Sequence, residues 1–150
     1  MDAPAATIPS DVDATSKRLH VAPWLDAEHE AIGYPLRHPY VEMFATSRLG
    51  CTGVLLLRRL GLHLDVEPDG FVIDVEHEAA ALGLGRRHWD RTWERLESYG
   101  HLLTLTSTHC ALRRSVRPLG RYWVRRLPEQ LQREHAEALV RWPLAGDRPF

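Results

Sequence analysis

Apolar residues recur through the middle of the chain at spacings of three and four, the pattern of helices that bury one side. The pattern predicts helices at about 40–64, 75–82, 86–99 and 128–142, with a short helix between Pro23 and Gly33. The helix at 40–64 is expected to break near 50–53, because two glycines lie there and glycine weakens a helix interior. Most of the ordered chain is therefore predicted to be helical.

Two other stretches have the composition of strands. The apolar run at 71–73 follows a Pro-Asp-Gly turn, which predicts a small strand. In 101–116, apolar and β-branched residues flank a polar turn at 106–109, which predicts a β-hairpin. We expect a mainly α protein with a small β-hairpin, in the α+β class.

The length of 150 residues and the 44% hydrophobic content fit one domain with a single core. Residues 1–22 are rich in Ala, Pro, Asp, Ser and Thr, which predicts a flexible arm. The domain is then expected at 23–120, and a C-terminal helix and tail at 121–150. No apolar run could span a membrane, and the start lacks the features of a secretion signal, so we expect a cytoplasmic protein without membrane contact.

Charge is distributed unevenly along the chain. Residues 1–83 carry 6 Lys and Arg against 13 Asp and Glu, whereas 84–142 carry 12 against 6. Such a division indicates either a basic binding surface or two parts that attract each other in the folded protein.

The segment AAALGL lies between two predicted helices that would cross closely. Ala79 is small enough for such a crossing, Gly83 gives the turn an unhindered backbone, and Leu84 occupies the apolar turn position. Trp89 and Trp93 would then anchor the second helix to the core. With the order helix, strand, helix, turn, helix and hairpin, the chain resembles the winged helix-turn-helix superfamily over about 48–116.

The segments HPYVEMFATSRLGCTGVLLLRRL and PDGFVIDVEHEAAALGLG also resemble a group of small, mostly uncharacterised actinobacterial proteins. The two resemblances imply a winged helix-turn-helix domain with extra helices at both ends. The resemblance to the winged helix-turn-helix superfamily implies a DNA-binding protein without catalysis, acting as a transcriptional regulator on double-stranded DNA, whereas the second resemblance supports the fold and adds almost no function.

In this family the third helix lies in the major groove and the hairpin touches the neighbouring backbone. Arginine suits such contacts because its planar guanidinium can bind a guanine edge or a phosphate. Arg113 and Arg114 are neighbours on a strand and cannot both lie on one face. The resemblance implies DNA contacts by Arg86, Arg87, Arg91, Arg95, Ser98, Arg113, Arg114 and Arg117.

The third predicted helix also carries Asp90, Glu94 and Glu97, which leave it close to neutral. We expect Arg91 and Glu94, three residues apart, to form a surface ion pair. The alternative function is therefore a winged-helix module that binds a protein partner within a larger transcription or replication assembly.

Other chemistry has little support in the sequence. Neighbouring residues of the triplet Glu76-His77-Glu78 diverge on a helix, so we expect this triplet on an outer surface and no bound metal. Phosphate-loop and nucleophile motifs are missing, and no cofactor or catalytic residue is predicted. Cys51 and Cys110 are expected to be buried, reduced thiols.

The last predicted helix has an apolar stripe of Leu131, His135, Ala138 and Trp142. This stripe would either join two copies into a homodimer or pack on the core of its own chain. Three tryptophans outside the helix-turn-helix segment, Trp24, Trp123 and Trp142, are expected to dock the flanking segments onto it.

Overall fold

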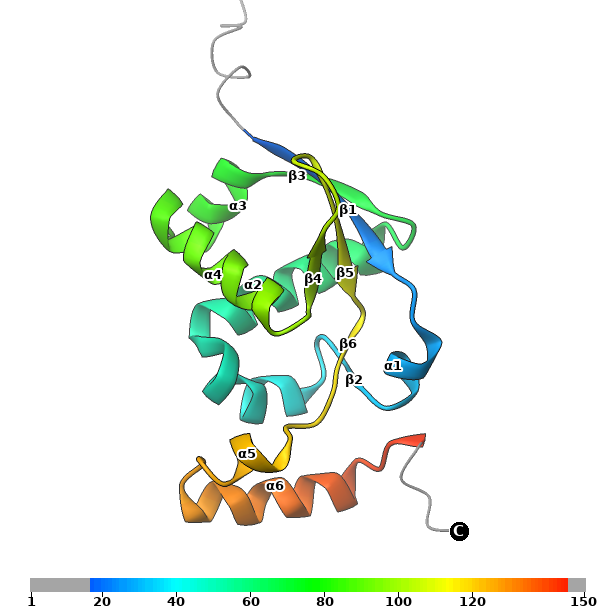
Figure 1. Ribbon diagram of the computed structural model, residues 1–150, viewed down its shortest axis with the longest axis vertical. Coiled ribbons are helices and arrows are strands. Elements are labelled where there is room, and N and C mark those ends of the chain that lie inside the picture. Colours follow the sequence, from blue (N-terminus) through cyan, green and yellow to red (C-terminus); the bar gives the residue numbers. More distant parts are fainter. Residues whose placement is uncertain (1–16, 146–150) are drawn as a thin grey trace, which may run out of the picture.

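A four-stranded sheet in the order β3-β1-β5-β4 forms one layer of the computed structural model, which describes residues 17–145 (Figure 1). Its strands are β1 (Arg18–Trp24), β3 (Phe71–Asp74), β4 (Leu102–Thr104) and β5 (His109–Arg113). Strand β1 is antiparallel to β3 and parallel to β5, and β4 and β5 form the predicted hairpin. A two-stranded sheet pairs β2 (Tyr34–Pro35) with β6 (Ser115–Val116).

The prediction of a flexible arm at 1–22 is wrong for residues 18–22, which belong to strand β1. The side chains of Leu19 and Val21 are 6% and 1% exposed, while His20 and Ala22 face solvent. This alternation is that of a strand with one buried face, but it rests on only two buried apolar residues, and the paired residues of β5 lie 89 positions further along the chain. Residues 1–16 lie outside the described part of the chain.

Six α-helices accompany the sheets in residues 17–145, so the fold is α+β. They are α1 (Ala27–Ala31), α2 (Thr46–Val66), α3 (Val75–Ala81), α4 (Arg86–Ser98), α5 (Arg121–Val124) and α6 (Glu129–Arg141), and a π-helical turn η1 (Val41–Ala45) precedes α2. None of these helices is long and apolar enough to cross a membrane. The short helix α1 begins after Asp26, whose carboxylate accepts a hydrogen bond from the His29 N–H, and not at Pro23, which belongs to β1.

The helix break predicted near 50–53 and the turn predicted at Gly83 are confirmed. The backbone of Gly50 is non-helical, with φ of 76°, and breaks the long helix α2. Asp74 begins α3, where its carboxylate accepts a hydrogen bond from the His77 N–H at 3.1 Å. Gly83 and Gly100, with φ of 70° and 76°, follow α3 and α4, because a residue without Cβ adopts this backbone conformation readily.

The main core lies between α2 and the inner face of the four-stranded sheet. Leu56, Leu57 and Leu60 of α2 are fully buried there, together with Ile73 and Leu112 from the sheet. Helices α3 and α4 close the side of this core (Figure 1). The predicted helical face of 86–99 is thus fixed against the core, and its other face is left to solvent.

Helix α6 packs on the core of its own chain, so the stripe considered for a homodimer is covered. His135 and Ala138 are buried, and the Tyr40 hydroxyl contacts the His135 Nε2 at 2.8 Å. The Tyr34 hydroxyl donates a hydrogen bond to the Trp142 carbonyl at 2.8 Å. Trp123 and Trp142 are half-buried against this second cluster, which confirms that they dock the C-terminal segment.

A buried histidine beside an arginine makes the fold sensitive to acid. His101 is 3% exposed, its Nε2 lies 3.3 Å from a guanidinium nitrogen of Arg48, and burial together with this positive charge lowers its pKa from 6.5 to about 3. At a pH between these two pKa values, His101 is protonated in the unfolded chain and neutral in the folded chain. The free energy of unfolding therefore falls as pH decreases through this range. At pH 5 the loss from His101 alone is about 2 kcal/mol.

Urea unfolding at pH 7 and pH 5 measures this loss. His29 and His135 also have a pKa lowered by burial, so they act in the same direction. In H101Q, whose amide oxygen can still accept from Arg48, we expect the difference between the two pH values to shrink by about 2 kcal/mol. A difference as large as that of the wild type would contradict the role assigned to His101.

Candidate nucleic-acid interface

Helices α3 and α4 are joined by a tight turn that presents the outer face of α4. Ala79 is 4% exposed at the crossing, and its carbonyl accepts a hydrogen bond from the Leu84 N–H at 2.8 Å. Trp89 and Leu96 are buried on the inner face of α4, and the Trp89 and Trp93 rings stack with centroids 5.6 Å apart. The apolar residues of this segment therefore have the packing role predicted for them.

The charges of α4 are segregated into two flanks. Because successive helical residues rotate by about 100°, Arg87, Arg91, Arg95 and Ser98 fall within one sector of roughly 80°, which we call the arginine flank. Asp90, Glu94 and Glu97 fall on the neighbouring sector toward β1 and the hairpin. The net charge of α4 is close to zero, but its basic and acidic residues lie on different sides. One side of the helix is therefore strongly basic.

The ion pairs of α4 differ from the predicted one. No ion pair joins Arg91 to Glu94 or to any other carboxylate of residues 17–145. Arg86 instead pairs with Asp90 at 3.1 Å and with Glu76 at 3.7 Å, which places its guanidinium on the acidic side of the helix. Glu97 accepts a hydrogen bond from the Thr104 hydroxyl at 2.6 Å. Arg86 is therefore paired with carboxylates of its own chain, whereas the charge of Arg91 is not compensated by an ion pair with residues 17–145.

Arg95 lies beside the break in α2. One of its guanidinium nitrogens is 3.5 Å from the Leu49 carbonyl oxygen, and a Cβ on Gly50 would lie 2.8 Å from the same nitrogen. Gly50 therefore serves two purposes, since it permits the turn of the backbone and leaves room for the Arg95 side chain. The Ser98 hydroxyl donates to the Arg95 carbonyl at 2.9 Å and ends the arginine flank.

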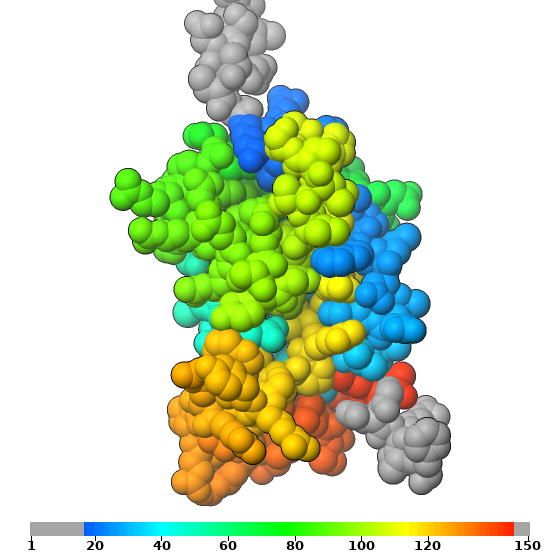
Figure 2. Space-filling model, viewed as in Figure 1, coloured from blue at the N-terminus to red at the C-terminus, as the bar shows by residue number. Residues whose placement is uncertain are grey.

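Helix α5 extends the exposed surface beyond the C-terminal end of α4. The Tyr99 and Trp123 rings meet edge to face, with centroids 5.7 Å apart, which joins the two helices. Figure 2 shows α4, the hairpin and α5 on one face of the molecule. Arg121, Arg125 and Arg126 are exposed, and the Arg126 guanidinium lies 4.4 Å from the centre of the Tyr122 ring.

Arg113 holds the fold together and does not belong to the outer surface. Its guanidinium pairs with Asp26 at 2.8 Å, donates to the Gly100 carbonyl at 3.0 Å and lies 3.7 Å from the centre of the Trp24 ring. Only 17% of this side chain is exposed. This placement gives no support to the predicted DNA contact of Arg113, because an N-terminal segment that the sequence did not place there surrounds its guanidinium.

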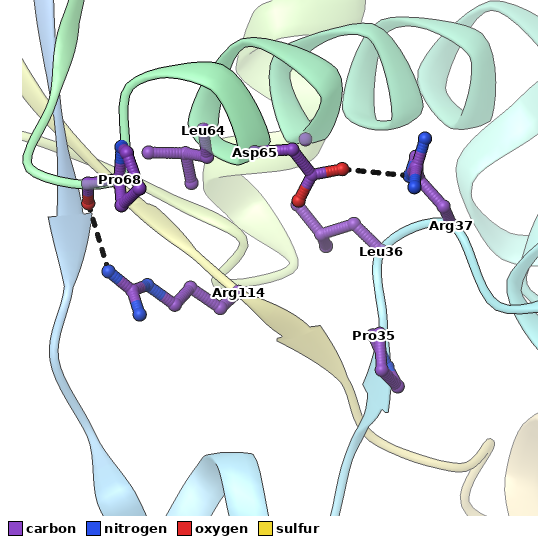
Figure 3. Close-up of a pocket in the computed structure, with 8 residues that line it drawn as sticks. Pro35, Leu36, Arg37, Leu64, Asp65, Pro68 and Arg114 are labelled. Atoms are coloured by element: carbon purple, nitrogen blue, oxygen red, sulfur yellow. Dashed lines mark hydrogen bonds and ion pairs between the residues drawn. The ribbon is translucent and has the colours of Figure 1, made fainter.

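Arg114 lies near the C-terminal end of α2, away from the arginine flank. It donates to the Pro68 carbonyl at 3.0 Å and lines a hollow of about 390 Å³ beneath the end of α2 (Figure 3). Arg37 and Asp65 also line this hollow and form an ion pair with each other at 3.0 Å. Arg117 is exposed near α1, where its charge contributes to lowering the His29 pKa. Neither Arg114 nor Arg117 joins the arginine flank.

The Glu76-His77-Glu78 triplet is not wholly on the surface. Glu78 is 3% exposed, forms an ion pair with Arg59, and has its Oε1 3.1 Å from the His63 Nε2. It faces α2, from which the Arg59 guanidinium compensates the buried carboxylate. The prediction of an outer surface holds for Glu76 and His77 and is wrong for Glu78.

The two cysteines differ from each other. Cys110 is buried, which raises its pKa to about 11 and keeps it a thiol at neutral pH. Cys51 follows the break in α2 and is exposed, so the prediction of a buried thiol is wrong for this residue. Its neighbour Gly50 has the non-helical backbone that interrupts α2.

Comparison with known proteins gives no relative: no protein-family model matches the chain, and neither curated proteins nor solved structures contain a significant match. Of the eight predicted residues, the structure brings together Arg87, Arg91, Arg95 and Ser98 on one flank of α4, and it places Arg86, Arg113, Arg114 and Arg117 elsewhere.

Proposed function

We propose that this protein is a non-catalytic, winged helix-turn-helix DNA-binding protein that regulates transcription. The order α2-β3-α3-α4-β4-β5 supports the proposal, with α4 as the recognition helix and the β4-β5 hairpin as the wing. The observation that carries it is the arginine flank, because a segregated row of cations on an exposed helix matches the charge of duplex DNA.

The arginine flank provides both kinds of contact that DNA recognition needs. Three arginines at successive turns give α4 donors along its whole length, and their guanidinium groups bind phosphate oxygens or the O6 and N7 of guanine. Phosphate contacts supply most of the affinity and base contacts the selectivity. The exposed arginines of α5 would lengthen the phosphate contact surface at the C-terminal end of α4.

Fluorescence anisotropy with labelled mixed-sequence duplexes tests the proposal. We expect saturable binding at low salt that weakens steeply as salt is added, because bound cations release the counterions of DNA. Absence of binding at low salt would refute the proposal.

The alternative function, a protein-binding module in a larger assembly, is favoured by a different surface. The outer face of the four-stranded sheet exposes Val72, Leu103 and Leu105 by 51%, 41% and 57%. This apolar side is separate from the arginine flank, so the two functions predict different footprints. A partner that protects the sheet face and leaves α4 accessible would support the alternative.

A further inference from the structure

A small hollow lies between α4 and the break in α2, beside the arginine flank. Its volume is about 200 Å³, and it is lined by Leu49, Thr52, His88, Arg91, Thr92 and Arg95. Two of these residues come from α2 and four from α4. The proximity of Thr52 to the arginines could not be predicted from the sequence, because Thr52 and Thr92 lie 40 residues apart and meet only in the folded protein.

The charge of this hollow is entirely positive. Arg91 and Arg95 line it, while no carboxylate does. Other hollows of residues 17–145 include acidic side chains: Asp65 beneath the end of α2, Asp90 and Glu94 beside Trp89, and Glu67 and Asp69 beside β1. A concave site that gathers two guanidinium groups without a compensating anion favours an anionic ligand.

The polar floor of the hollow is fixed by hydrogen bonds. The Thr92 hydroxyl donates to the His88 carbonyl at 2.9 Å, so the Thr52 hydroxyl, 3.2 Å from that of Thr92, acts as donor to it. Both hydroxyl protons are therefore used, and the donors left for a ligand are the two guanidinium groups and the imidazole of His88. Several N–H donors around one small volume match the tetrahedral oxygens of phosphate better than a planar carboxylate.

We propose that this hollow binds a phosphate group, held by Arg91, Arg95 and His88. The group belongs either to the DNA backbone or to a free phosphorylated molecule. The first source rests on the proposed function, whereas binding of a free phosphate does not require DNA. In either case Arg91 and Arg95 contact phosphate, which leaves Arg87 as the arginine of α4 available for a base edge.

Titration with inorganic phosphate tests the site directly. At constant ionic strength maintained with chloride, we expect saturable shifts of the backbone amide NMR signals of Thr52, His88 and Thr92. R91Q should weaken phosphate binding by roughly tenfold, since one charge-assisted contact is lost. R95Q should do the same, and R133Q serves as the matched control because Arg133 lies on α6 and pairs with Glu129.

The outcomes separate the inference from the proposed function. Shifts that do not saturate, or saturable shifts that both R91Q and R95Q leave unchanged, would overturn the phosphate site whether or not DNA binds. Phosphate binding at the hollow without duplex binding would support the site and count against the proposed function. Where both bind, phosphate that displaces a duplex more strongly than chloride does assigns the hollow to the DNA backbone. Equal displacement assigns it to a free phosphorylated ligand.

Discussion

Replacing Arg91 and Arg95 together by alanine is expected to weaken duplex binding by roughly 100-fold, at about 1.4 kcal/mol for each arginine. Both residues lie on the arginine flank of α4, and neither is used in an ion pair with a carboxylate of residues 17–145. The loss should be largest at low salt, and the slope of log Kd against log salt should decrease by about 2, because two phosphate contacts disappear.

The matched control replaces two arginines on other surfaces. Arg58 of α2 pairs with Glu42 of η1, and Arg133 pairs with Glu129 on α6, so R58A/R133A removes the same net charge without touching the arginine flank. We expect this variant to lose less than a third of the effect of R91A/R95A. Equal losses in the two double variants would show that only net charge matters and that α4 has no special role.

Replacing Val21 by asparagine is expected to lower the free energy of unfolding by about 4 kcal/mol. Val21 is 1% exposed in the central strand β1, so V21N removes buried apolar surface and leaves an amide without partners in the core. Ala22, the next residue, faces solvent, and A22N is expected to cost no more than about 1 kcal/mol. Urea unfolding followed by circular dichroism gives both values.

This pair of variants distinguishes a strand from an arm. In a flexible arm, neighbouring residues would tolerate the same substitution equally, whereas in β1 they point to opposite faces of the sheet. Similar stabilities for V21N and A22N would contradict the placement of β1 between β3 and β5.

The helices could be predicted from the sequence because their signals are local. The spacing of Trp89, Trp93 and Leu96, the Asp74 cap and the glycines after α3 and α4 all act within a few residues of the chain. Strand β1 could not be predicted because what stabilises it is distant: its partners β3 and β5 lie about 50 and 90 residues further along the chain. The two-residue strands β2 and β6 and the four-residue helix α5 are too short for a periodic pattern.

The part of the candidate site that could be predicted also depends on local spacing within one helix. Helical spacing alone places Arg87, Arg91 and Arg95 on one flank. The surroundings of a side chain depend on the fold. The contacts of the partly buried Arg113 with Asp26 and Trp24 could therefore not be predicted from the sequence. His88 and Thr52 were missed because they become neighbours only where α4 crosses the break in α2.

The salt dependence of duplex binding by the wild-type protein tests the central claim most directly, since its slope counts phosphate contacts. With labelled duplex and salt varied at fixed pH, the phosphate contacts of Arg91 and Arg95 predict a slope of log association constant against log salt of about −2. Contacts from α5 would make this slope steeper. A slope near zero, or no binding at the lowest salt, would contradict the assignment of α4 as a DNA-binding helix.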